Sequence, residues 1–256
     1  MHDYLQAYDE QLRGDSELTT ASSVVRIGPL FLATFGSDGY ITYRGEDAAR
    51  AAAFVDEAVA HFRAAPAVET VEWKTRGHDE APELHDALVA RGFEPDEPES
   101  IMIGEARLLA VDVALPAGVE LRRATTEAEV RAMSALQAEV FGNPVSESRI
   151  AELLSALDSG EGVELWFAEA GGEIVCTGRL TPVPGTEFAG IWAGGTRPDW
   201  RRRGIYRALT AERARSALRL GKRYINSDST EFSRPILERA GFVRVSTTTP
   251  YELKLR

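Results

Sequence analysis

The sequence predicts an α/β protein of the mixed α+β type, with two domains in tandem that each have a central mixed sheet flanked by helices. Helical stretches alternate with strand-like stretches along the 256 residues, which is typical of a sheet covered by helices. A weak repeat favours duplication. The segments "PELHDALVARGFEP" (82–95) and "RPILERAGFVRV" (234–245) are both helical stretches that open near proline and close at Gly-Phe, with strand-like residues around each. Two unrelated helices with ordinary glycine stops are the alternative interpretation.

The first domain is expected to cover residues 1–115. Its helices are predicted from apolar residues at helical spacing over 3–13, 46–64 and 80–91. Its strands are predicted from alternating or β-branched stretches, namely "VVRIGPLFLATF", "GYITYR", "AVETVEWKT" and "SIMIGEARLLAVDV". The acidic, Pro-rich segment 94–100 indicates a surface turn, and "ALPAG" (114–118) is the expected linker.

The second domain is expected to cover 116–256. It opens with the strand "VELRRA" and a helix capped by Thr125 or Thr126, followed by a helix over 146–157. The later strands are expected at "VELWFAEA", "GGEIVCTGRLTPV", "EFAGIWAGGT", "KRYINSD" and in the tail "FVRVSTTTPYELKL". Gly171-Gly172 predicts a hairpin between the first two of these strands. Helices are expected at about 203–219 and at 232–240.

Composition narrows the function classes. The chain has one cysteine, Cys176, and a formal net charge of −11, so we expect no internal disulfide, no Cys-based metal cluster and no general nucleic-acid binding. No apolar run approaches the roughly 18 to 20 residues that span a bilayer, and the N-terminus carries acids where a secretory signal would be basic. We therefore expect a cytoplasmic protein without metal, nucleic-acid or membrane partners.

The charge is unevenly distributed along the chain. Residues 197–223 hold ten Arg or Lys against Asp199 and Glu212, so this window carries +8 and the remainder −19. Such a local excess indicates one anionic ligand rather than an extended polyanion. A solvated, Arg-rich helix start is the alternative interpretation.

The stretch "PDWRRRGIYRALT" (198–210) predicts an anion-binding helix start. A strand ends at Thr196, the chain turns, and a helix begins near Arg203, so the first peptide N–H groups lack partners within the helix. These donors and the helix dipole favour phosphate. The spacing is neither the G-x-x-x-x-G-K-[ST] of nucleoside triphosphatases nor the GxGxxG of dinucleotide-binding folds.

Strand, P-x-x-R-x-R-G-I and helix together resemble the acyl-CoA-binding segment of the GNAT N-acetyltransferase superfamily, whose signature is [QR]-x-x-G-x-[GA]. Arg201, Gly204 and Tyr206 occupy its three defined positions, and Tyr206 departs from the usual Gly or Ala. The resemblance covers about 119–256, and "RPILERAGF" is similar to the family's later helix. The first half resembles a degenerate copy without the signature, so we expect it not to bind CoA.

The resemblance implies that acetyl-CoA is the cosubstrate and assigns residues to it. The backbone of Arg201, Arg202, Arg203, Gly204, Ile205 and Tyr206 would hold the pyrophosphate, and Ala193, Gly194, Gly195 and Thr196 would run beside the pantetheine arm. One N–H group of that strand would stabilise the oxyanion; a bulge or crowded packing is the alternative reason for "AGG". Ser233 falls where the family often has a small residue beside CoA.

The acid and base of the reaction are less defined. The family often has a tyrosine four residues before the Gly of Gly-Phe, where this sequence has Leu237, and its fourth strand often carries a carboxylate that "AGIWAGG" lacks. Tyr251 and Tyr206 are the substitute acids. Carboxylate candidates are Glu187, Asp228 and Glu231, of which we favour the first two; each also suits a surface acid or helix cap.

Other reactive residues have structural interpretations. Cys176 lies in a predicted strand and is expected to be a buried, small apolar residue rather than a nucleophile. His78-Asp79 is expected in a turn and helix cap, since adjacent side chains of an extended chain point to opposite sides. The remaining histidines show no metal-ligand spacing.

We thus expect an N-acetyltransferase that moves acetyl from acetyl-CoA to a small-molecule amine by direct attack, as a monomer with two similar halves or as a homodimer. An acyl-CoA sensor without turnover is the first alternative. A basic surface that docks an acidic partner is the second, and salt would weaken it strongly.

Overall fold

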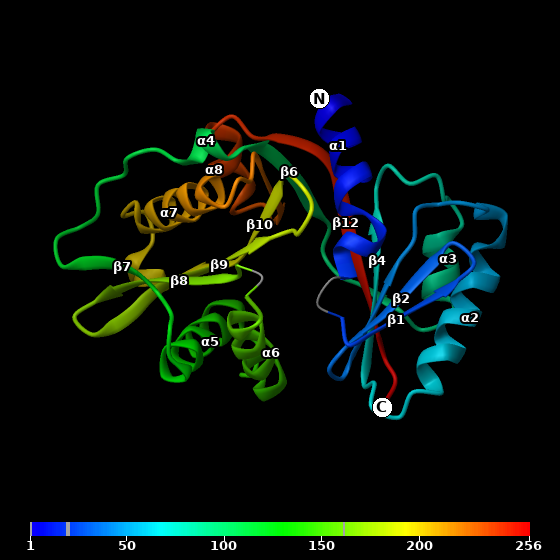
Figure 1. The fold of residues 1–256 in the computed structure, drawn as a ribbon. Coiled ribbons are helices and arrows are strands. Elements are labelled where there is room, and N and C mark those ends of the chain that lie inside the picture. Colours follow the sequence, from blue (N-terminus) through cyan, green and yellow to red (C-terminus); the bar gives the residue numbers. More distant parts are fainter. Residues whose placement is uncertain (1, 19–20, 161) are drawn as a thin grey trace. The chain divides into compact units, whose positions relative to one another are not determined.

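A computed structural model describes residues 2–18, 21–160 and 162–256 (Figure 1). The chain folds into two compact units. Unit 1 holds the described residues up to Ile101 together with Asp228–Glu231 and Arg244–Arg256, and unit 2 holds Met102–Ser227 and Phe232–Val243. The predicted boundary between residues 115 and 116 stays a prediction, because these units follow packing rather than chain order.

Unit 1 is built on a mixed sheet. Its strands, in spatial order, are β1 (Ser23–Ile27), β2 (Leu30–Phe35), β3 (Asp38–Thr42), β4 (Thr70–Arg76) and β12 (Val243–Lys254), and β5 (Glu94–Pro95) pairs with β12. Strands β3 and β4 are parallel, whereas β12 pairs with β4 antiparallel. The stretch predicted as one strand forms both β1 and β2 because the chain reverses at Gly28, whose φ of 56° is left-handed.

Helices cover both sides of this sheet. They are α1 (His2–Leu12), α2 (Ala51–Arg63) and α3 (Leu84–Val89), with short 3-10 turns at Gly14–Leu18 and Ala48–Arg50. Figure 1 shows α1 on one side of the strands and α2 and α3 on the other. The core between α2, α3 and the sheet includes Phe54, Trp73, Leu88, Phe93 and Tyr251. Helix α3 is shorter than the predicted 80–91.

Unit 2 is also built on paired strands. Its strands, in spatial order, are β6 (Glu99–Glu105), β11 (Tyr224–Ser229), β10 (Phe188–Thr196), β9 (Glu173–Pro182), β8 (Glu164–Ala170) and β7 (Val119–Arg123). Strands β10 and β11 are parallel and β7 to β10 are antiparallel. The hairpin at Gly171-Gly172 is confirmed, with φ values of 60° and 84°. The stretch from Ser100 to Val113 is not all strand, because β6 gives way to α4 (Ala106–Leu109).

The helices of unit 2 lie on opposite faces of its sheet (Figure 1). Helices α5 (Glu127–Phe141) and α6 (Glu147–Asp158) cover one face, and α7 (Ile205–Arg219) covers the other. Helix α8 (Arg234–Arg239) follows β11. The predicted caps are confirmed: Thr126 forms a capping box with Glu129, and Ser146 caps α6. No helix within the described ranges is long and apolar enough to cross a membrane.

Candidate active site

The predicted anion-binding segment lies between β10 and α7. A 3-10 turn over Pro198–Trp200 follows β10, and α7 begins at Ile205, two residues later than expected. The chain enters the helix through two left-handed residues, Arg202 with φ 62° and Gly204 with φ 81°. The peptide N–H groups of 202–207 donate to no carbonyl of the described backbone. The start of α7 therefore presents a row of unbonded donors at the positive end of a 15-residue helix.

Three arginines lie in the same segment as these donors. Arg201, Arg202 and Arg203 are all exposed. Arg201 donates from Nε to the carbonyl of Thr196, 3.0 Å away, and the Arg203 guanidinium lies 4.8 Å from the ring centre of Trp200. These contacts keep the positive charge beside the helix start, where it suits a phosphate group.

Strand β10 contains a bulge at the segment expected beside pantetheine. Its register against β9 shifts between Trp192 and Gly195, and Ala193 has a left-handed φ of 53°. A Cβ at Gly194 would lie 2.6 Å from the Tyr206 ring, and one at Gly195 would lie 3.2 Å from a Val140 methyl carbon. Packing within the chain thus accounts for both glycines, and the bulge leaves residues 193 and 194 without partners in the register against β9.

Tyr206 and the buried Arg213 lie beside this bulge. Arg213 is 1% exposed, and its guanidinium carbon is 6.0 Å from the Tyr206 ring centre. It donates to Thr210 Oγ1 at 3.0 Å and to the carbonyls of Arg179 and Trp192 at 3.3 and 3.5 Å. Burial lowers the pKa of Arg213. Helix α7 therefore contributes a phenol and a hydrogen-bonded guanidinium at the same bulge.

Two further positions from the family resemblance lie on α8. Ser233 precedes the helix and is in unit 2, like the segment 193–206. Leu237, which stands where the family often has tyrosine, is fully buried among Met102, Leu180 and Ile225. The side chain at 237 thus fills the core, and α8 offers no phenol there.

The three predicted acid–base residues are engaged elsewhere. Glu187 precedes β10 and lies 3.8 Å from Arg223; it is six residues, or about 20 Å of strand, from Ala193. Asp228 belongs to unit 1, where its carboxylate pairs with Lys74.

The hydroxyl of Tyr251, also in unit 1, lies 2.7 Å from Nδ1 of His85, and burial raises its pKa. Asp228 and Tyr251 thus have partners within unit 1, and Glu187 lies at the opposite end of β10 from the bulge.

Cys176 has the predicted structural role. It is fully buried beside Ile205 and Leu209, and burial raises the pKa of its thiol to about 11. The hydroxyl of Thr196 donates to its sulfur at 3.1 Å. A thiol with so high a pKa is a poor nucleophile near neutral pH.

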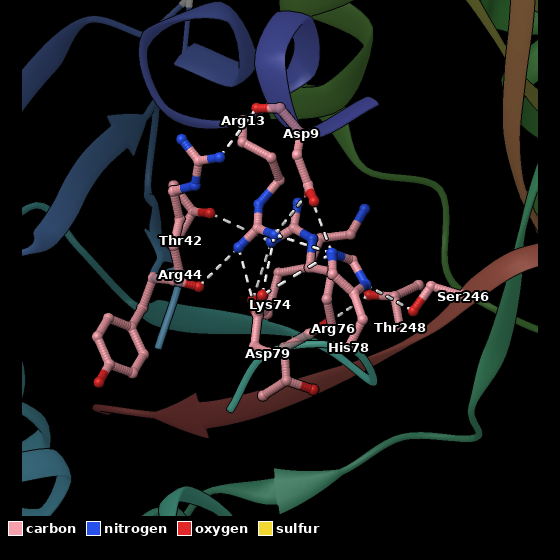
Figure 2. A network of polar contacts seen from close by, with 12 residues as sticks. Asp9, Arg13, Thr42, Arg44, Lys74, Arg76, His78, Asp79, Ser246 and Thr248 are labelled. Atoms are coloured by element: carbon pink, nitrogen blue, oxygen red, sulfur yellow. Dashed lines mark hydrogen bonds and ion pairs between the residues drawn. The ribbon is translucent and has the colours of Figure 1, made fainter. Parts of the chain in front are cut away.

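Unit 1 holds a polar cluster that sequence reasoning did not predict (Figure 2). Arg13, whose side chain is 1% exposed, binds Asp79 through two bonds of 3.1 and 3.0 Å. His78 lies 3.1 Å from Asp9 through Nε2 and 2.7 Å from Ser246 through Nδ1. The chain turns at 77–80, so His78 and Asp79 both reach this cluster, and the expectation that they point apart is wrong.

Asp9, His78 and Ser246 contact one another in the order of a catalytic triad, carboxylate to imidazole to hydroxyl. The residues around them indicate a structural role instead. The Arg13 guanidinium shares Asp9, at 3.3 Å, and lies 3.4 Å from His78 Nε2. The 400 Å³ hollow nearby is lined by Asp9, Arg13 and His78 and not by Ser246. The cluster joins α1, the turn after β4 and β12 within unit 1. Among the described residues, no group of three or more His, Cys, Asp or Glu side chains is placed to hold a metal ion.

Comparison with known proteins agrees with this geometry. Residues 104–227 match the family model described as an acetyltransferase (GNAT) domain. That segment contains the β10 bulge and the start of α7. No curated protein matches the chain significantly.

Solved structures are similar along most of the chain. A GCN5-related N-acetyltransferase from Kribbella flavida is 18% identical with a TM-score of 0.67, over 91% of this chain and 90% of that one. One from Sphaerobacter thermophilus is 19% identical with a TM-score of 0.60, over 89% and 77%. A tandem GNAT protein from the clavulanic acid biosynthesis pathway is 15% identical with a TM-score of 0.61, over 91% and 82%. At such identities these likenesses show the fold.

Proposed function

Because residues 104–227 match the model of a GNAT acetyltransferase domain, we propose that the chain transfers an acetyl group from acetyl-CoA to the amine of a small molecule. The unbonded N–H groups of 202–207, together with the adjoining arginines, carry this proposal. They match the pyrophosphate of CoA in charge and in hydrogen-bonding capacity.

In this proposal the chain holds the donor along one path. The backbone from Arg201 to Tyr206 binds the pyrophosphate, Ala193–Thr196 lies beside the pantetheine arm, and Ser233 lies at its edge. The amine nitrogen attacks the thioester carbon, and the C–N bond forms as the carbonyl π electrons move to oxygen. An N–H group of the bulge stabilises that oxyanion. The C–S bond then breaks, the amine gives up a proton, and the CoA thiolate accepts one.

Tyr206 is the proposed proton donor to the thiolate. Its ring faces Gly194 of the bulge, as the 2.6 Å approach of an added Cβ shows. Tyr251 has less support, since its hydroxyl contacts His85 in unit 1. Glu187 and Asp228 have less support as bases because Arg223 and Lys74 lie beside them. Water is the proposed acceptor of the amine proton.

Isothermal titration with acetyl-CoA tests the donor site. We expect saturable binding by the wild-type protein and none by the double variant Arg201→Glu with Gly204→Glu, which places negative charge at the helix start. The matched control is Arg219→Glu with Gly221→Glu at the other end of α7, which should bind normally. Absence of wild-type binding, or equal binding by both variants, would contradict the proposal.

Two observations favour a second function, an acyl-CoA sensor without turnover. The family tyrosine position is the buried Leu237, and the interior of β10 carries no carboxylate. Release of free CoA from acetyl-CoA with a broad panel of amines separates the two functions, since a sensor binds acetyl-CoA and releases none.

A further inference from the structure

A small cavity opens on the face of the unit 2 sheet that α5 and α6 cover. Its volume is about 20 Å³, room for one water-sized group. Gln137 and Arg149 line it from the helices, and Arg179 and Ala193 line it from β9 and β10. Because Ala193 is also the left-handed residue of the β10 bulge, the cavity adjoins the proposed site of acyl transfer.

Arg179 enters this cavity with an unsatisfied charge. Its Nε is buried without a hydrogen-bond partner, and its side chain forms no ion pair with any described residue. Burial and the nearby charge of Arg149 lower the pKa of Arg179 to about 10, with Glu152 acting in the opposite direction. Arg179 is half-buried, and a guanidinium nitrogen buried without a partner is costly to a fold, so its presence calls for a partner that binds there.

The neighbouring Arg149, in contrast to Arg179, has an ion-pair partner. Arg149 pairs with Glu152 on α6, with 2.8 Å between Nη1 and Oε2. Arg149 thus has a counterion within its own helix. The positive charge of Arg179 remains available to a ligand.

Other polar atoms on the same face of the sheet also lack partners. Arg179 pairs in register with Trp192, and Thr181 pairs with Gly190, which in turn pairs with Asn226 of β11. Alternation along each strand therefore puts Arg179, Thr181 and Asn226 on one face. Thr181 Oγ1 and Asn226 Oδ1 are both buried and unbonded. This face of the sheet thus has a cationic donor at Arg179 and neutral acceptors at Thr181 and Asn226. A ligand with an anionic group at one end and an N–H group at the other would match both.

We propose that Arg179 binds a carboxylate of the acceptor, and that the acceptor is a small amino acid or a similar compound carrying amine and carboxylate together. This inference rests on the proposed acetyl transfer. Held at Arg179, the carboxylate would keep the amine beside the Ala193 bulge. A carboxylate fits the water-sized cavity better than a phosphate, and the planar guanidinium binds two carboxylate oxygens at once.

Matched acceptors test the proposal. Release of CoA thiol is measured with an amino acid, its carboxamide and its decarboxylated amine, with the phosphonate analogue as a fourth arm. We expect kcat/KM to be about 50-fold or more higher for the carboxylate, as loss of a buried charge partner costs binding by that order. In Arg179→Met the preference should vanish, whereas Arg131→Met, an exposed arginine of α5, should keep it. A preference for the phosphonate, or equal use of amide and acid, would overturn the inference.

Two further measurements separate this inference from neighbouring explanations. Arg179→Met should melt at the same or a higher temperature, because it removes an uncompensated charge; a lower melting temperature would assign Arg179 a purely structural role. Arg179→Lys keeps the charge without the planar fork and should lose about tenfold of the preference. If no acceptor releases CoA, the proposed transfer fails. Titration of the amino acid into wild type and Arg179→Met then decides the inference: equal binding overturns it, and binding by wild type alone supports it.

Discussion

The ring of Tyr206 lies against Gly194, so closely that a Cβ at Gly194 would come within 2.6 Å of it. The residue that departs from the family signature therefore points toward the β10 bulge. If this phenol protonates the thiolate, Tyr206→Phe should lower kcat about 100-fold, a common loss for a general acid, and leave acetyl-CoA binding intact. Steady-state kinetics with calorimetry checks this. A comparable loss in Tyr251→Phe, with Tyr206→Phe fully active, would point to the other candidate.

Two glycines with positive φ flank α7 and allow a controlled test of the helix start. Gly204 has φ 81° and Gly221 has φ 74°. Alanine at either position should cost about 1 kcal/mol of folding free energy, because a Cβ disfavours this conformation. Only Gly204→Ala should also weaken acetyl-CoA binding. Chemical denaturation and calorimetry measure both effects, and equal binding by the two variants would argue against ligand contact at 204.

Acid should destabilise unit 1 through Glu17. Burial raises the pKa of this carboxyl, but Arg76 and Lys74 outweigh it and the pKa is lowered overall. A carboxyl whose pKa is lowered on folding stabilises the folded state when the pH is above its ordinary pKa, about 4.3 for Glu. That stabilisation is lost as the pH falls through the pKa of the folded state. We expect Glu17→Gln to cost about 3–5 kcal/mol of folding free energy at pH 7, because it leaves the buried Arg76 without this ion-pair partner. The folding free energy of this variant should also fall less steeply than that of wild type as the pH is lowered.

Asp56 is the matched control for Glu17. Arg91 lowers the pKa of Asp56 by a hydrogen bond of 2.7 Å, but this carboxyl side chain is 64% exposed. Asp56→Asn should leave stability nearly unchanged. Urea unfolding between pH 3 and 7 compares the two variants, and parallel curves for Glu17→Gln and wild type would contradict the assignment.

The last strand should stabilise the unit formed mainly by the first residues of the chain. Leu253 of β12 is 6% exposed in the core of unit 1 with Trp73 and Phe93. Leu253→Ala should cost about 2–5 kcal/mol, and the less buried Leu255→Ala should cost less. Denaturation followed by hydrogen exchange localises the loss; faster exchange confined to unit 2 would be the contrary result.

The features that could be predicted from the sequence are those set by residues close together in the chain. The caps at Thr126 and Ser146 were predictable, and the start of α7 was predicted to within two residues, because each is set within a few positions. The predicted strand over 100–113 failed because α4 is held by a tertiary bond, from Ala106 N–H to the Arg223 carbonyl at 2.8 Å. Pattern alone does not report that contact.

The contents of the site were harder to predict for the same reason. The unpaired state of Arg179 depends on residues from α6, β9 and β10, and Arg13 meets Asp79 across 66 positions of chain. Tyr206 was recognised as unusual, but its direction follows from the bulge at 193–195. A single sequence carries no signal for contacts between residues that lie far apart in the chain.

The strand order of unit 1 also constrains how the protein is made. Strand β12 pairs with β4 from Thr248 to Lys254, so the sheet begun by the first strands is completed by a strand that lies 174 positions further along the chain at Thr75 and Thr249. Until β12 has been synthesised one edge of β4 stays unpaired, and such an edge is open to association with other chains. The nascent chain therefore gains by keeping that edge covered until β12 emerges, and a product that stops before β12 is the form most exposed to aggregation.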